Sequence, residues 1–195
     1  MHIPLNFNLR GKRVLLVGAG VSACEKLALL SKSDCDLTIV AKSASADFES
    51  LLQSMPDDSY RLHLRQFEES DLDQQMFLFV AINDTEQSRE IADRAKKRGL
   101  LVNSACHPEQ CDFYTTSLIT RGKVQLSIAT DGQFAGLSAA LRRHFEWALP
   151  EEHNDDWETI FRLRSELIQA NKSSEERRKI LKSIIQKIEN EYLSR

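Results

Sequence analysis

The chain of 195 residues is 42% hydrophobic and 28% charged, which is the composition of a folded globular protein and excludes a disordered or fibrous one. Its formal net charge of −3 gives no electrostatic reason to expect nucleic acid as a partner. The apolar runs are too short to span a bilayer and the N-terminus lacks the apolar centre of a secretory signal, so we expect a cytoplasmic protein with no membrane partner.

The first hundred residues alternate between short apolar runs and stretches in which apolar residues have helical spacing. The apolar runs predict strands at 13–17, 36–40, 61–67, 76–82 and 100–102. The helical spacing predicts helices at 21–31, 48–52 and 86–97. Apolar strands separated by helices are typical of a parallel sheet with both faces covered. We therefore expect a doubly wound α/β domain over residues 1–112.

From residue 113 the pattern changes to two strands followed by a helix. Apolar runs predict strands at 113–120 and 123–129, joined at Arg121-Gly122. Helical spacing resumes at 137–149 and ends at Pro150. Residues 113–149 are therefore expected to form a small strand–helix region of their own.

The last segment, 150–195, is predicted to be a pair of helices. Trp157, Ile160 and Phe161 begin an apolar face with helical spacing, and Ser173 with Glu176 forms a capping box at the start of the second helix. About forty residues are too few to bury a core alone. The helical pair must therefore pack on the rest of the chain or on a second subunit.

A glycine-rich turn follows the first predicted strand. The segment from Gly18 to Ala23 fits the pattern G-x-G-x-x-A, directly after a strand and at the start of a helix. Gly18 permits the tight turn, Gly20 lets the backbone approach a pyrophosphate, and Ala23 allows close contact between helix and strand. The segment predicts a Rossmann-like dinucleotide site, and the alternative is a glycine turn that binds nothing.

The end of the second predicted strand lacks the acidic residue that usually binds an NAD ribose. Ala41, Lys42 and Ser43 follow the apolar run, and Asp47 lies beyond the expected position. Lys42 and Ser43 could instead meet a phosphate, although a solvated lysine is the simpler interpretation. NADP therefore stays open beside NAD.

Several segments together resemble a known family. They are IPLNFNLRGKRVLLVGAG at 3–20, AIND at 81–84, GLLVN at 99–103, CDF at 111–113 and IAT at 128–130. In this order they resemble the precorrin-2 dehydrogenase / sirohydrochlorin ferrochelatase family, which forms the N-terminal module of siroheme synthase. The resemblance extends from residue 3 to about 149, and the C-terminal helices share only their helical character.

The resemblance implies an NAD-linked oxidation of precorrin-2 to sirohydrochlorin, with Fe²⁺ as the substrate of a possible ferrochelatase step. It also implies a homodimer in which residues 113–149 are dimerisation elements, and a tetrapyrrole cleft beside the cofactor domain. Thr130 matches a hydroxyl residue of the family's substrate site and is a catalytic candidate. The implied cofactor contacts are Val21, Ser22, Ala41, Lys42, Ser43, Asn83 and Asp84, in addition to Gly18, Gly20 and Ala23 of the glycine turn.

The chain departs from the family at a position that carries chemistry. Cys106 stands where the family has a functional aspartate, and it is the second catalytic candidate. A carboxylate is ionised at neutral pH and can accept a proton, whereas an ordinary thiol is mostly neutral there. As a thiolate, Cys106 would be a soft ligand for a metal on its way into the ring. Alternatively, it is a small residue in a site without chelatase activity.

These observations favour an NAD-dependent dehydrogenase over a chelatase, because hydride transfer depends mainly on holding the nicotinamide against the ring. One alternative is a carrier that binds a tetrapyrrole or nucleotide without turnover. Another is a chelatase without dehydrogenase activity. No resident metal site is expected, because Cys106, His107 and Cys111 are too few ligands for structural zinc.

Overall fold

The structure is a computed structural model that describes residues 3–131, 133–151, 154–170 and 173–190. Its contacts divide the chain into two compact units, Met1–Thr115 and Thr116–Arg195. Each unit is described by itself. No helix among the described residues is long and apolar enough to cross a membrane.

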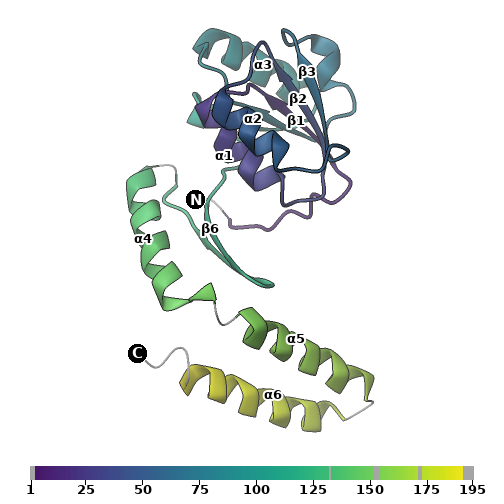
Figure 1. Cartoon of the computed structure of the whole chain (residues 1–195), viewed down its shortest axis with the longest axis vertical. Helices are drawn as coiled ribbons and strands as arrows, with labels where there is room; N and C mark the ends of the chain where they lie inside the picture. Colours follow the sequence, from purple (N-terminus) through teal and green to yellow (C-terminus); the bar gives the residue numbers. More distant parts are fainter. Residues whose placement is uncertain (1–2, 132, 152–153, 171–172, 191–195) are drawn as a thin grey trace. The chain divides into compact units, whose positions relative to one another are not determined.

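The first unit, drawn in Figure 1, is a parallel sheet. Its five strands have the order β3-β2-β1-β4-β5. The strands are β1 (Arg13–Val17), β2 (Asp36–Ala41), β3 (Tyr60–Leu64), β4 (Phe77–Val80) and β5 (Leu101–Ser104). The helices of this unit are α1 (Val21–Leu30), α2 (Ala46–Gln53) and α3 (Thr85–Lys97), with short 3₁₀ turns at Glu69–Leu72 and Pro108–Gln110. The predicted doubly wound, Rossmann-like α/β fold is therefore confirmed.

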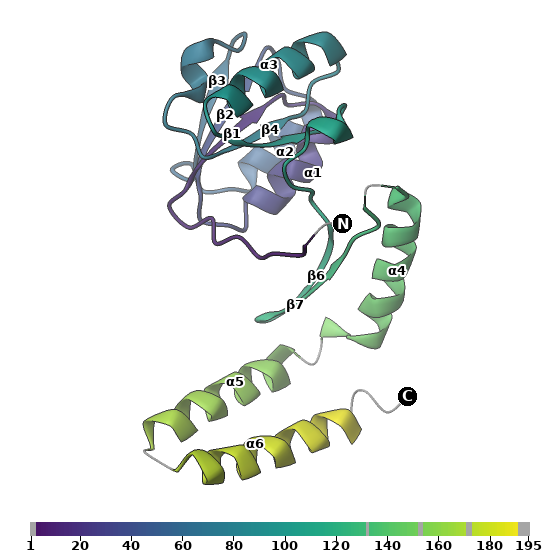
Figure 2. The same ribbon diagram turned by 180° about the vertical axis from the view of Figure 1, so that it is seen from behind.

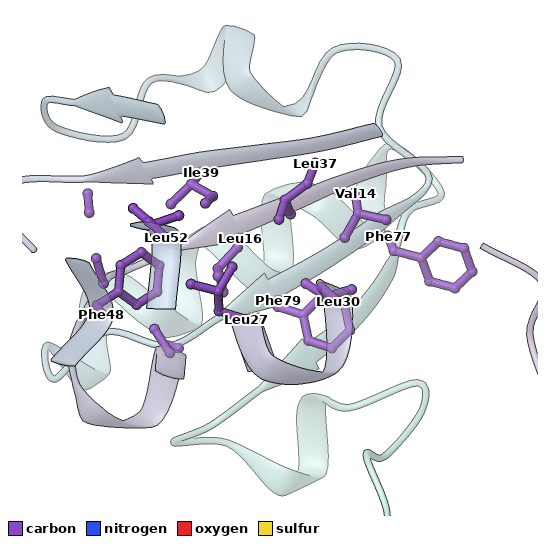
Figure 3. Packing of buried hydrophobic residues seen from close by; sticks show 14 residues of the cluster. Val14, Leu16, Leu27, Leu30, Leu37, Ile39, Phe48, Leu52, Phe77 and Phe79 are labelled. Carbon is purple, nitrogen blue, oxygen red and sulfur yellow. The ribbon is translucent and has the colours of Figure 1, made fainter. Parts of the chain in front are cut away.

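Helices cover both faces of this sheet. Helices α1 and α2 lie on one face, and α3 lies on the other, which is seen from behind in Figure 2. Successive residues of a strand point to opposite faces. Leu16 of the central strand therefore packs with Leu27 on the α1 side (Figure 3), whereas Leu15 packs with Ile91 of α3. This two-sided burial explains why the strands are continuous apolar runs.

Two predicted strand boundaries are wrong, and each has a physical reason. The strand expected at 61–67 ends at Leu64, because the Arg65 amide turns back to the His63 carbonyl and the Arg65 guanidinium pairs with Asp71. The strand expected from residue 113 begins at Ser117. Phe113 instead packs its ring edge-on against rings of the first unit.

The second unit contains a hairpin and three helices. Strands β6 (Ser117–Arg121) and β7 (Val124–Ile128) pair antiparallel, and β6 contacts α4 (Ala135–Ala148). Helices α5 (Asn154–Gln169) and α6 (Ser174–Ile188) pack against each other. The predicted capping box is confirmed, because the Ser173 hydroxyl accepts from the Glu176 amide and the Glu176 carboxylate accepts from the Ser173 amide.

Candidate cofactor and active site

The carboxyl ends of β1 and β4 form the switch point of the sheet. The chain leaves β1 toward β2 on one side and leaves β4 toward β5 on the other. In open α/β sheets, ligands bind in the crevice outside the strand ends at such a point. The glycine turn after β1 lies at this crevice, next to Ala81 and Ile82, which follow β4.

Gly18 is required by the fold itself. Its φ of +111° is rarely adopted by residues with a side chain, and an added Cβ would lie 2.2 Å from the Ala81 carbonyl oxygen. The position is held from both sides, because the Gly18 amide donates to the Val40 carbonyl at 2.9 Å and the Ala81 amide donates to the Val17 carbonyl at 2.8 Å. Gly18 thus lets β1 and β4 end close together.

Gly20 is different, because the protein leaves the space beside it open. Its φ of −94° and ψ of −167° suit any residue, and an added Cβ would meet no protein atom within 4 Å. Helix α1 begins after it with no acidic residue in its first turn and no side chain as a cap. First-turn amides such as those of Val21 and Ser22 have no intrahelical partner and attract anions. These residues fit the pyrophosphate of a dinucleotide.

The loop after β2 is tied to the glycine turn. The Ser45 amide donates to the Ala19 carbonyl at 3.0 Å, which holds the loop beside the turn. Ala41 is buried at the end of β2, whereas Lys42 and Ser43 are exposed. Their exposed side chains can meet a ribose or a phosphate.

Asn83 and Asp84 lie on the loop between β4 and α3. Asn83 is exposed. Asp84 is the N-cap of α3, and its carboxylate accepts from the Gln87 amide at 2.9 Å. This cap starts the helix at Thr85, one residue before the predicted start. Asp84 therefore stabilises α3 in addition to any contact with a cofactor.

Cys106 lies beside the same crevice, on the loop that follows β5. Its thiol donates to the Ile82 carbonyl oxygen at an Sγ–O distance of 3.3 Å. Ile82 in turn borders the glycine turn, because a Cβ on Gly18 would lie 3.1 Å from its Cγ2. The structure thus brings Cys106 next to the residues that follow β1 and β4.

His107 is a residue of this loop whose contacts the sequence does not reveal. Its imidazole is buried, and Nε2 lies 2.8 Å from the Thr85 carbonyl oxygen, which can only accept, so Nε2 carries a proton. Nδ1 lies 3.2 Å from the Glu109 carboxylate. A backbone hydrogen bond and the neighbouring His107 lower the pKa of the Glu109 carboxyl. His107 fastens the Cys106 loop to the first turn of α3.

Cys111 fastens the other end of the loop. Its sulfur accepts from the Ser104 amide at 3.2 Å, and burial raises the pKa of its thiol. Nearby, the side-chain Nδ2 of Asn103 donates to the Phe113 carbonyl at 2.9 Å. Cys106 and Cys111 thus contact different partners. Within the described part of the chain, no three His, Cys, Asp or Glu side chains gather as a metal site would require.

Thr130 belongs to the second unit and is not placed relative to the crevice. Its hydroxyl donates to the Phe134 carbonyl at 3.2 Å and accepts from the Phe134 amide at 3.4 Å. These bonds close the turn that leads into α4. Its assignment as a catalytic residue stays a prediction.

The sheet order and the glycine turn define a dinucleotide-binding α/β protein. Residues 5–117 match the model of the family described as "Putative NAD(P)-binding", and the chain belongs to this family.

Similar proteins with an assigned name extend the comparison. The chain is 32% identical over 148 residues to a siroheme synthase of Acinetobacter baylyi, with 75% of this chain and 32% of that protein covered. It is 29% identical over 178 residues to siroheme synthase 1 of Yersinia enterocolitica, with 91% and 37% covered. The chain thus spans about a third of the length of these relatives, and the predicted resemblance to a module of siroheme synthase is confirmed.

A solved structure shares the fold. The structure described as "SirC, precorrin-2 dehydrogenase" superposes with a TM-score of 0.78 at 23% identity, and the match covers 94% of this chain and 89% of that chain. At this identity the likeness establishes the fold. It extends through the second unit as well as the Rossmann-like one.

Proposed function

We propose that the chain is an NAD-dependent dehydrogenase that oxidises precorrin-2 to sirohydrochlorin. The observation that carries the proposal is the open space at Gly20 beside uncapped amides at the sheet's switch point. That arrangement fits a dinucleotide, and the similarity to siroheme synthases supplies the substrate class. The reaction removes a hydride and a proton from the tetrapyrrole, and NAD accepts the hydride when bound.

In this proposal the chain's own residues bind and orient the cofactor. The amides of Val21 and Ser22 donate to the pyrophosphate, and the space beside Gly20 admits it. Lys42 and Ser43, beyond Ala41, contact the adenosine ribose, while Asn83 and Asp84 contact the cofactor at the end of β4. The catalytic contribution is orientation of the two reactants, which converts hydride transfer into an effectively unimolecular step.

Cys106 is not proposed as the proton acceptor. Its thiol already donates to the Ile82 carbonyl. A thiol engaged in this way lacks the carboxylate oxygens with which the family aspartate can accept a proton. We propose that the oxidation proceeds without it and that the proton leaves to solvent, so insertion of Fe²⁺ is not part of the proposed activity.

We also propose that the protein is a cytoplasmic homodimer and that a second copy covers residues 113–149. A two-stranded hairpin such as β6–β7 is marginally stable by itself. Leu137, Leu141 and Phe145 form a stripe of helical spacing on α4, and 46%, 37% and 37% of their surfaces are exposed. Burying this stripe against a partner would stabilise both elements. Leu141→Glu is expected to convert the dimer to a monomer in light scattering.

The test of the activity is an anaerobic incubation of the protein with freshly generated precorrin-2 and NAD, followed by absorbance. Conversion that needs both protein and NAD supports the dehydrogenase. Tetrapyrrole that stays bound without conversion would instead identify a carrier. NADP is run in parallel. Residues 42–45 contain no carboxylate that would repel the 2′-phosphate of NADP.

Cys106→Ala and Cys106→Asp are run in the same assay. Loss of a general base costs about 10²–10⁴-fold in rate. We expect Cys106→Ala to lower the oxidation rate by less than about tenfold, since the thiol is engaged with the backbone. A loss of a hundredfold or more would show that the thiol takes part in the reaction. Insertion of Fe²⁺ by Cys106→Asp but not by the wild type would explain what the family aspartate contributes.

A further inference from the structure

The helical pair of the second unit carries a groove of about 550 Å³ between α5 and α6. The apolar part of its lining, here called the floor, comes from both helices: Leu167 and Ile168 of α5, and Leu181 and Ile185 of α6. Ile168 remains 46% exposed and Ile185 54% exposed, so packing of the two helices against each other does not cover them. An exposed apolar floor of this kind is typical of a binding surface.

Four basic side chains also line the groove. They are Arg164 of α5 and Arg177, Arg178 and Lys182 of α6. In the described part of the chain, the structure records no ion pair for any of these four. Basic residues of the same helices that lie outside the groove do have partners: Arg162 pairs with Glu166 at 3.9 Å and Lys179 with Glu175 at 3.3 Å. The groove thus gathers positive charge that the helices themselves do not neutralise.

This charge argues against the same groove of a second copy as the occupant. In a symmetric dimer the same surface patch of both subunits meets. The arginines and lysine of one groove would then face those of the other, and like charges that face each other across an interface are destabilising. The occupant is therefore expected to be an anion.

The apolar floor further restricts the chemical class of the anion. An inorganic phosphate would pair with the arginines and leave the leucine and isoleucine side chains uncovered. A flat aromatic molecule with carboxylates on its rim would cover the floor with its face, while its rim pairs with the guanidinium groups, which match carboxylates well. Tetrapyrroles with acetate and propionate side chains have this character.

We propose that the α5–α6 groove is a docking site for a polycarboxylated tetrapyrrole. The identity of the ligand class rests on the proposed function, whereas the cationic, apolar character of the groove does not. The site holds the tetrapyrrole by ion pairing and by contact with its face. It is built entirely from the second unit and contains none of the residues of the NAD crevice.

The test is a titration of uroporphyrin III, an air-stable tetrapyrrole with carboxylates on every ring, into the full chain, followed by fluorescence anisotropy. The double variant Arg164→Gln/Arg178→Gln is expected to weaken binding about tenfold, since two guanidinium groups lose their contacts with carboxylates. The matched variant Arg162→Gln/Lys179→Gln removes the same charge from the same helices outside the groove. It is expected to bind within about twofold of the wild type, and wild-type binding should weaken with added salt.

Equal binding by the two double variants, or no binding by the wild type, would overturn the docking site. A lower mass of the groove variant in light scattering would also overturn it, because the groove would then be an interface between copies. The titration contains no NAD and needs no turnover. A failed docking site therefore leaves the conversion assay intact, and failed conversion with a tenfold effect in the groove would contradict the dehydrogenase alone.

Discussion

Substitution by alanine should lower stability at one glycine of the turn after β1 and weaken NAD binding at the other. Gly18→Ala places a methyl group 2.2 Å from the Ala81 carbonyl oxygen in a conformation with φ +111°. The positive φ costs about 1–3 kcal/mol and the displaced backbone about 1–3 kcal/mol more. We expect a loss of about 3 kcal/mol in the free energy of unfolding, which lowers the thermal midpoint by roughly 10 °C.

Gly20→Ala is the matched variant. Its methyl group meets no protein atom within 4 Å, and the backbone of Gly20 has a φ of −94°. The free energy of unfolding should therefore change by no more than about 0.5 kcal/mol. The methyl group does enter the space assigned to the pyrophosphate. We expect the Kd for NAD to rise at least about tenfold, which corresponds to 1.4 kcal/mol.

Circular dichroism melting and titration calorimetry with NAD separate the two effects. The account requires that Gly18→Ala melts early and that Gly20→Ala melts like the wild type but binds NAD poorly. A Gly20→Ala protein that binds NAD as tightly as the wild type would refute the assignment of this space to the cofactor. A Gly18→Ala protein with an unchanged midpoint would refute the argument from the Ala81 carbonyl.

Three further substitutions test other parts of the structure. Burial lowers the pKa of Lys26, so between that lowered pKa and 10.5 the native state binds fewer protons than the unfolded chain. The free energy of unfolding, measured by urea titration, should therefore rise with pH across this window, and Lys26→Met should abolish the rise. Phe113→Ala removes ring contacts to Phe77 and Phe79 at 5.7 and 5.3 Å and should cost about 2–3 kcal/mol, measured by urea unfolding; a cost below about 0.5 kcal/mol would contradict its packing role. Ser173→Ala removes the cap of α6 and should cost about 1 kcal/mol, with faster amide hydrogen exchange confined to the second unit.

The parallel sheet could be predicted because the residues within each strand already indicate burial on both faces. Residues 14–17 and 77–80 are apolar throughout, as burial on both faces requires, and the structure buries all of them. The end of α3 is also local, since basic residues precede Gly99, whose φ is +80°. The glycine turn could be predicted for the same reason, because its pattern lies within six consecutive residues.

The surroundings of Cys106 could not be predicted in this way. Its thiol contacts the carbonyl of Ile82, 24 positions earlier, and His107 contacts the carbonyl of Thr85, 22 positions earlier. These contacts join loops that follow neighbouring strands, so they depend on the sheet order rather than on periodicity. The early end of β3 has a more local cause, because the Arg65 guanidinium pairs with Asp71 six positions later, and the alternation of apolar residues does not reveal this pairing.

The most direct test of the central claim is the stoichiometry of the oxidation. Wild-type protein is incubated without oxygen with precorrin-2 and NAD, and the NADH and sirohydrochlorin that form are quantified together. The account predicts equal amounts of both products, with formation of each abolished when NAD is omitted and slowed in Gly20→Ala. Sirohydrochlorin that forms without matching NADH, or at the same rate in the absence of NAD, would contradict it.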